Sequence, residues 1–210
     1  MHLWKYNILC SLFTVTVLWL APDCKCQNDV KNIELQTFAG FVQFDKSLSF
    51  DSSPLFGLGA GYDIRKYLQF NLNVYFSPTR QHIRTATSEL TTNVFMYQYQ
   101  FNIKFQSQQR FFNLVTPFMQ TGAGGIIFNP EKTTLDTGGG NFLEFNPNTE
   151  HKSQLHLGGG FVQTLTQKLK LLFQYEVVLF HSEKLKVDGI STKNIIARNS
   201  IWGINFTYHF

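Results

Sequence analysis

The sequence predicts an all-β protein, specifically an eight-stranded antiparallel up-and-down transmembrane β-barrel. Apolar side chains recur at every second position over many segments, with glutamine, asparagine or glycine between them, which is the pattern of two-faced strands. Charged residues make up only 15% of the chain, against roughly 25% in soluble domains. The gaps between these segments alternate between short and long, which is typical of barrels that cross an outer membrane.

The N-terminal segment 1–26 is predicted to be a signal peptide. Lys5 precedes a mostly apolar stretch, Tyr6 to Leu20, that is too short to span a bilayer comfortably as a helix. Small or weakly polar residues follow, and we expect cleavage near Cys26 or after Ala21. The remaining residues, 27–210, would form one barrel domain. All three cysteines lie at or before residue 26, so a disulfide scaffold and a thiol enzyme are not expected in the mature chain.

Eight strands follow in order along the chain. Their expected ranges are Ile33–Phe44, Leu55–Ile64, Leu68–Ser77, Thr92–Gln106, Leu114–Phe128, Ser153–Thr164, Leu169–Phe180 and Asn199–Phe210. The expected long loops are Asp45–Pro54, Pro78–Thr91, Asn129–Lys152 and His181–Arg198. Ten strands are also arithmetically possible, although eight fit the alternation of turns better. The third long loop has room for a small hairpin. An even number of strands places both mature termini on the side of the short turns, which is the periplasm in a bacterial outer membrane.

The two faces differ most clearly in Thr92–Gln106, where aromatic residues alternate with amides. A register that faces water would be rich in lysine and glutamate, whereas the polar register of this segment carries mainly glutamine and asparagine. We therefore expect the apolar register to face lipid and the amide register to face a narrow lumen. The predicted lumen residues are Gln98, Gln100, Asn102, Lys104, Gln174, Glu176 and Asn205. Lys104 and Glu176 either form an ion pair or are each satisfied by neighbouring amides or water.

The last strand ends in Trp202, Ile204, Phe206, Tyr208 and Phe210 at alternate positions. The chain resembles the small outer-membrane β-barrel superfamily that includes the OmpA N-terminal domain and the OmpX type, a group of porin-family barrels. The stretches that carry this resemblance are LQTFAGFVQF (35–44), residues 54–78, PFMQTGAGG (117–125), residues 155–175 and WGINFTYHF (202–210).

The resemblance implies a biogenesis pathway and a set of partners. Phe206, Tyr208 and Phe210 would form the insertion signal that the barrel assembly machinery reads, after periplasmic chaperones have delivered the chain. The implied partners are outer-membrane lipid and lipopolysaccharide, with no nucleic acid, and a monomer is expected. The basic residues Arg80, Arg84, Lys184 and Lys186 are candidate contacts for lipopolysaccharide phosphates.

One stretch carries residue types that suit catalysis. His181, Ser182 and Glu183 follow the seventh strand, and outer-membrane lipid A deacylases use a histidine, a serine and a carboxylate. The family pattern is His-x-Ser-Asn, whereas here the histidine and the serine are adjacent, and adjacent strand residues point to opposite faces. No cofactor and no metal site are expected.

The favoured function is therefore that of a non-enzymatic integral outer-membrane protein. It would have a structural or surface-interaction role through its extracellular loops, or at most form a narrow pore, because eight strands leave little free interior. One alternative is a lipid A deacylase-like esterase that uses His181 and Ser182. A second is a secreted soluble barrel that binds an apolar ligand.

Overall fold

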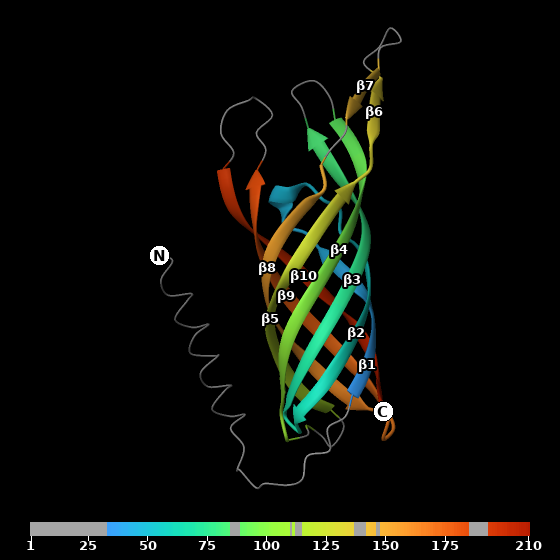
Figure 1. Cartoon of the computed structure of the whole chain (residues 1–210), viewed down its shortest axis with the longest axis vertical. Helices are drawn as coiled ribbons and strands as arrows, with labels where there is room; N and C mark the ends of the chain where they lie inside the picture. Colours follow the sequence, from blue (N-terminus) through green and yellow to red (C-terminus); the bar gives the residue numbers. More distant parts are fainter. Residues whose placement is uncertain are drawn as a thin grey trace.

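Eight strands close into one barrel in the computed structural model, which describes residues 33–84, 89–109, 111, 115–136, 142–145, 148–184 and 193–210. The barrel strands are β1 (Ile33–Gln43), β2 (Ser53–Arg65), β3 (Leu68–Arg84), β4 (Glu89–Gln106), β5 (Val115–Pro130), β8 (Glu150–Thr164), β9 (Leu169–Lys184) and β10 (Lys193–His209). All neighbours are antiparallel, and β1 pairs with β10 to close the wall (Figure 1). The predicted fold class is confirmed, whereas the predicted signal peptide lies outside the described residues. None of the described helices is long and apolar enough to cross a membrane.

The barrel has two ends of different character. The start of β1 and the C-terminus lie at one end, together with the connections at 66–67, 107–114 and 165–168, and we call this the terminal end (Figure 1). The opposite end, which we call the loop end, carries the other connections. The third of these holds a separate two-stranded sheet, β6 (Thr133–Asp136) and β7 (Phe142–Phe145). The barrel therefore has eight strands, not ten, and the extra pair forms a small hairpin in the third long loop, where the sequence left room for one.

Two of the predicted long loops are wrong, because most of their residues extend the strands. β3 and β4 remain paired from Ser77↔Met96 to Arg84↔Glu89, and β9 and β10 remain paired out to Lys184↔Lys193. The sequence interpretation ended these strands where the apolar alternation stops. Pairing between backbone groups does not need an apolar face, so the hairpins continue beyond the apolar band.

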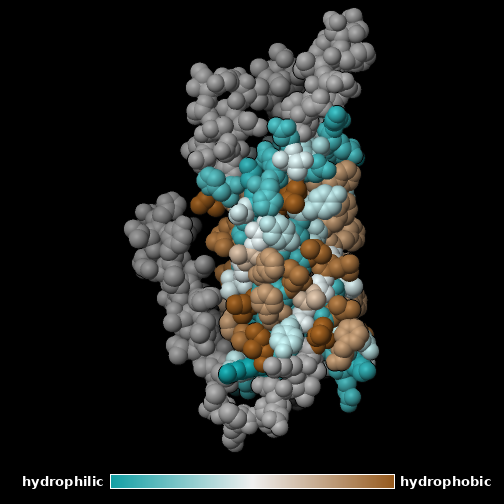
Figure 2. All heavy atoms as spheres, viewed as in Figure 1, coloured by the Kyte–Doolittle hydropathy of each residue, from teal (hydrophilic) through white to brown (hydrophobic). Residues whose placement is uncertain are grey.

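The apolar register faces outward over the middle of the barrel. On β4, Tyr97, Phe101, Ile103 and Phe105 are exposed while the intervening amides are buried. Figure 2 shows the result as a band of largely hydrophobic side chains across the visible face of the barrel, with hydrophilic residues above and below it. The second alternative, a soluble barrel that is apolar inside and polar outside, does not fit this band.

Candidate functional site

Charged side chains meet inside the barrel at its terminal end. Glu34 on β1 is 1% exposed, and its carboxylate lies 3.0 Å from Lys170 Nζ on β9 and 3.9 Å from Lys104 Nζ on β4. His209 on β10 contacts the same carboxylate. A carboxylate removed from water needs such partners, because an uncompensated buried charge is strongly destabilising. We call Glu34, Lys104, Lys170 and His209 the ionic cluster.

Asp63 on β2 extends the ionic cluster toward β3, where Gln69 Nε2 donates a hydrogen bond of 2.8 Å to its carboxylate. Glu34, Asp63 and His209 offer metal-ligand atoms within 4.8 Å of one another. A divalent cation there would face the ammonium groups of Lys104 and Lys170, which already pair with the Glu34 carboxylate. The arrangement fits an ion-pair network better than a metal centre.

Glu176 on β9 is the second buried carboxylate, and it lies farther along the lumen with 0% exposure. Gln174 Nε2 donates to it at 3.1 Å, Gln100 Nε2 donates at 3.2 Å, and Gln120 donates a third hydrogen bond. Gly158 pairs with Glu176 across the strands, and a Cβ at Gly158 would lie 2.6 Å from Glu176 Cγ. The carboxylate is therefore held by amides in a space that a glycine leaves open.

Lys104 and Glu176 do not form the ion pair that the sequence left open. Lys104 pairs with Glu34 instead, because β4 and β1 present these two residues at the same end of the lumen. Asn205 joins the same amide layer as Glu176 by donating to Gln174, and Asn102 contacts His156. All seven residues predicted to face the lumen are buried inside the barrel.

Toward the loop end the interior is mainly apolar, which the sequence interpretation missed. The buried cluster there consists of Phe38, Val42, Phe44, Leu55, Tyr75, Val94, Met96, Ile126, Phe128, Val178, Phe180, Ala197 and Ile201. Phe38 and Tyr75 pack edge to face across the lumen with ring centroids 5.2 Å apart. We call this set the apolar plug. Its members alternate with outward apolar residues, so sequence periodicity could not tell which register was inside.

The first connection at the loop end, residues 44–52, folds over the apolar plug. Phe50 stacks on Phe128 with ring centroids 5.0 Å apart, and Phe44 packs against both. The segment contains a short 3₁₀ helix, η1 (Lys46–Leu48), which Asp45 caps. Aromatic stacking of this kind adds about 0.5–1.5 kcal/mol to the burial of the rings themselves.

Asp45 fixes this connection to β10. Its carboxylate accepts hydrogen bonds from Ser47 N at 2.9 Å, from Ser47 Oγ at 2.7 Å and from Arg198 N at 3.1 Å, and its own backbone N–H donates to Asn199 Oδ1 at 3.1 Å. The backbone hydrogen bond from Ser47 is the main cause that lowers the pKa of Asp45 below its ordinary value. The ionised carboxylate therefore stabilises the folded connection.

The candidate catalytic residues His181, Ser182 and Glu183 lie on the β9 extension, in register with Ile196, Ile195 and Asn194 of β10. His181 is exposed, whereas the side chains of Ser182 and Glu183 lie outside what the structure describes. Both positions belong to the paired part of β9, where successive positions alternate between the two faces of a sheet.

The remaining predicted residues divide between the two ends. Arg80 is exposed at the loop end, while the side chains of Arg84 and Lys184 and the whole of Lys186 lie outside the described part. At the terminal end Phe206, Tyr208 and Phe210 are 52%, 42% and 66% exposed on the outer face.

Sequence reasoning missed the other members of the ionic cluster. Glu34, Lys170 and His209 lie at strand ends, where a charged or polar residue looks like part of a turn. The alternation of Glu34 and Gln36 with Ile33 and Leu35 was the signal that could have placed Glu34 in the lumen.

The comparisons with known proteins agree with this geometry. The family described as "Outer membrane protein beta-barrel domain" matches residues 27–210. The Neisserial surface protein A structure aligns with a TM-score of 0.55 and 13% identity, over 86% of this chain and 97% of its own. The outer membrane protein OprG from Pseudomonas aeruginosa aligns with a TM-score of 0.53 and 10% identity, over 87% and 97%. These identities establish a shared fold only. No curated protein sequence matches at a significant level.

Proposed function

This chain belongs to the outer membrane protein β-barrel domain family, and we propose that it is a closed, non-enzymatic outer-membrane barrel that acts through its loop-end surface. The terminal end would face the periplasm and the loop end the cell exterior. This orientation is supported by the positions of the start of β1, of the C-terminus and of the short connections, as in other barrels of this kind.

The filling of the lumen by buried side chains is the observation that carries the proposal. The ionic cluster fills the terminal end, the amides around Glu176 fill the middle, and the apolar plug fills the loop end. An ion that crossed would have to break the contacts of Glu34, pass the amide layer, and then enter a mainly apolar region that offers few polar groups to replace its hydration. A narrow pore, the weaker form of the sequence prediction, is therefore not expected to conduct.

Conductance measurements test this part of the proposal. We expect the purified protein to give no ion-conducting events in planar bilayers and no swelling of proteoliposomes in isosmotic sugar. The variant Glu34→Ala should also be silent, because the apolar plug is unaffected. A steady single-channel conductance in the wild type would contradict the closed barrel.

The exterior role is supported by strand extensions that leave unpaired edges. β8 follows β9 only as far as Gln154↔Phe180, and β1 follows β10 only as far as Gln43↔Ser200. In the part of the chain that the structure describes, the β9–β10 hairpin therefore rises beyond its neighbours, and on the β10 side Asp45 engages Arg198 and Asn199. Backbone groups on such an edge are ready to pair with an extended segment of another protein.

Surface labelling tests the orientation. A cysteine introduced at Thr91, near the loop end of β4, should react in intact cells with a membrane-impermeant maleimide. A cysteine at Gln167, in the turn before β9, should react only after the outer membrane has been permeabilised. The reverse pattern would place the terminal end outside.

The esterase alternative has its own test. Lipid A from cells that produce the wild type should match lipid A from cells that produce Ser182→Ala, because adjacent strand positions separate His181 from Ser182. Loss of one acyl chain with the wild type alone would identify an enzyme.

A further inference from the structure

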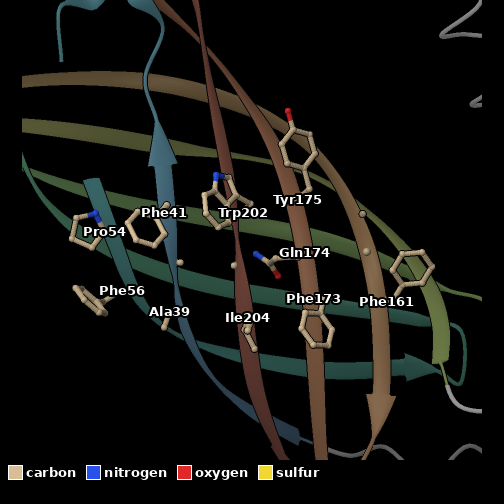
Figure 3. Close-up of a pocket in the computed structure, with 14 residues that line it drawn as sticks. Ala39, Phe41, Pro54, Phe56, Phe161, Phe173, Gln174, Tyr175, Trp202 and Ile204 are labelled. Atoms are coloured by element: carbon tan, nitrogen blue, oxygen red, sulfur yellow. The ribbon is translucent and has the colours of Figure 1, made fainter. Parts of the chain in front are cut away.

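A furrow crosses the outer face of the barrel over β2, β1, β10, β9 and β8 (Figure 3). Its volume is about 900 Å³ and its lining is almost entirely apolar. The row nearer the loop end contains Pro54, Phe41, Trp202 and Tyr175, and the row nearer the terminal end contains Phe56, Ala39, Ile204, Phe173 and Phe161.

Two small outward residues create the furrow. Ala39 lies between Phe56 and Ile204 in its row, and Gly159 follows Tyr175 in the other row. Phe41 and Trp202 stack at 5.1 Å to form one wall. A hollow lined by short side chains and bounded by rigid aromatic rings has the shape of a binding site for a hydrocarbon chain.

A second, polar hollow of about 460 Å³ lies beside the furrow, where β2, β3 and β4 approach the loop end. Pairing between β2 and β3 stops at Phe56↔Phe76. Pro54 and Pro78, which lie just beyond that point, have no N–H group with which to continue the ladder. The backbone ladder is therefore interrupted until Asp51 N donates to Arg80 O at 2.9 Å. Ser52, Thr79, Arg80 and Asn93 line the hollow at this interruption.

Arg80 provides the positive charge of the polar hollow. Its side chain is exposed, and no carboxylate among the described residues forms an ion pair with it. The carboxylate of Asp51, which also lines the hollow, lies 3.1 Å from His82 Nε2. Asn93 Nδ2 donates to Glu131 at 2.9 Å. An exposed guanidinium group that has no ion-paired carboxylate among the described residues is suited to bidentate binding of a phosphate.

Pro54 lines both hollows, so the polar hollow and the furrow are adjacent along the outer face. We propose that together they bind one lipopolysaccharide molecule, with a lipid A phosphate at Arg80 and an acyl chain in the furrow beneath Trp202 and Phe41. The choice of lipopolysaccharide rests on the proposed orientation, because the loop end then lies in the outer leaflet. The outer face of the barrel would thus carry one defined lipid site.

Native mass spectrometry of the detergent-refolded protein tests the site. The probes are hexa-acylated bisphosphorylated lipid A and, separately, phosphatidylglycerol. We expect the wild type to retain one lipid A. Arg80→Gln, which removes the charge-assisted contact, and Ala39→Leu, which fills the furrow, should each weaken retention about tenfold.

Two matched variants serve as controls. Arg198→Gln removes an exposed arginine at the loop end that lies outside the polar hollow, and Ala123→Leu enlarges an exposed alanine on β5 that lies outside the furrow. Both should retain lipid A as the wild type does. Heat-modifiable migration on gels establishes that every variant is folded.

Three results would overturn the proposal. The first is equal retention of lipid A by all folded variants, and the second is equal losses in the controls. The third is tighter retention of phosphatidylglycerol than of lipid A by the wild type, which would assign the site to a phospholipid. Failure here is distinguishable from failure of the closed-barrel proposal, which is decided by conductance and not by lipid binding.

Discussion

Lys170 Nζ on the ninth strand lies 3.0 Å from the carboxylate of Glu34 on the first, although 136 positions separate the two residues in the chain. Lys104 and His209 reach the same carboxylate from β4 and β10. One buried carboxylate thus joins parts of the wall that are distant both in sequence and around the circumference.

Removal of this carboxylate should be costly. Glu34→Gln leaves Lys104 buried without its counter-charge, and we expect the free energy of unfolding to fall by about 3–5 kcal/mol. Urea unfolding in lipid vesicles, followed by tryptophan fluorescence, measures the loss. The matched control is Glu150→Gln, which breaks a pair with Lys152 at 3.2 Å between more exposed groups and should cost no more than about 1 kcal/mol. Equal losses in both variants would show that burial of the cluster is unimportant.

The outward register of β3 makes a second prediction. Val74 is 51% exposed near the middle of the strand, where it would face hydrocarbon. Val74→Arg should lower stability in vesicles by about 2–4 kcal/mol, because an arginine at the midplane must be desolvated. Gln167→Arg, in an exposed turn, should have almost no effect in the same urea titration. An unchanged stability of Val74→Arg would argue against a lipid-facing register.

Asp45 predicts how the loop-end connection responds to pH. Its pKa is lowered in the folded protein, so its contribution is fully present above the ordinary value of 3.8 and is lost as the pH falls through the lowered value. Hydrogen exchange of the Ser47 amide, corrected for its intrinsic rate, should therefore show protection at neutral pH that decreases below about pH 4.

The variant Asp45→Asn provides the comparison for that measurement. It lacks the ionised acceptor, so the Ser47 amide should exchange faster at neutral pH, and the acid-dependent decrease in protection should be absent. Persistence of the same acid transition in Asp45→Asn would assign it to another group.

The C-terminal aromatic residue makes a prediction about assembly. Phe210 is 66% exposed, packs edge to face with Tyr208 at 5.1 Å, and donates its backbone N–H to Ile33 O. We expect Phe210→Ala to reduce the amount of heat-modifiable protein in the outer membrane several-fold. Phe111→Ala, which removes an exposed phenylalanine from a terminal-end turn, should leave that amount unchanged. Normal assembly of Phe210→Ala would remove the proposed role of Phe210 as an insertion signal.

Much of the fold could be predicted from the sequence, because a barrel wall obeys a strict two-residue period. The opposite faces of Phe101 and Asn102 on β4, and of Phe206 and Thr207 on β10, follow directly from it. The period fails at the loop end, where residues such as Met96 and Val178 are apolar but face inward. It also cannot reveal contacts across the lumen, such as Glu34 with Lys170, since these depend on how the wall closes.

The closure of β1 against β10 has a consequence for how the protein matures. Glu34 emerges early in synthesis, whereas Lys170 and His209 lie in the last strands to be made. Until β10 docks beside β1, the Glu34 carboxylate lacks these partners, and a barrel that lacks its last strand would have to hydrate this charge in an unfinished interior. A stable barrel wall thus requires β10 as well as the earlier strands, because β10 completes the ion pairs of Glu34. Copies that lack β10 should therefore be degraded by periplasmic proteases.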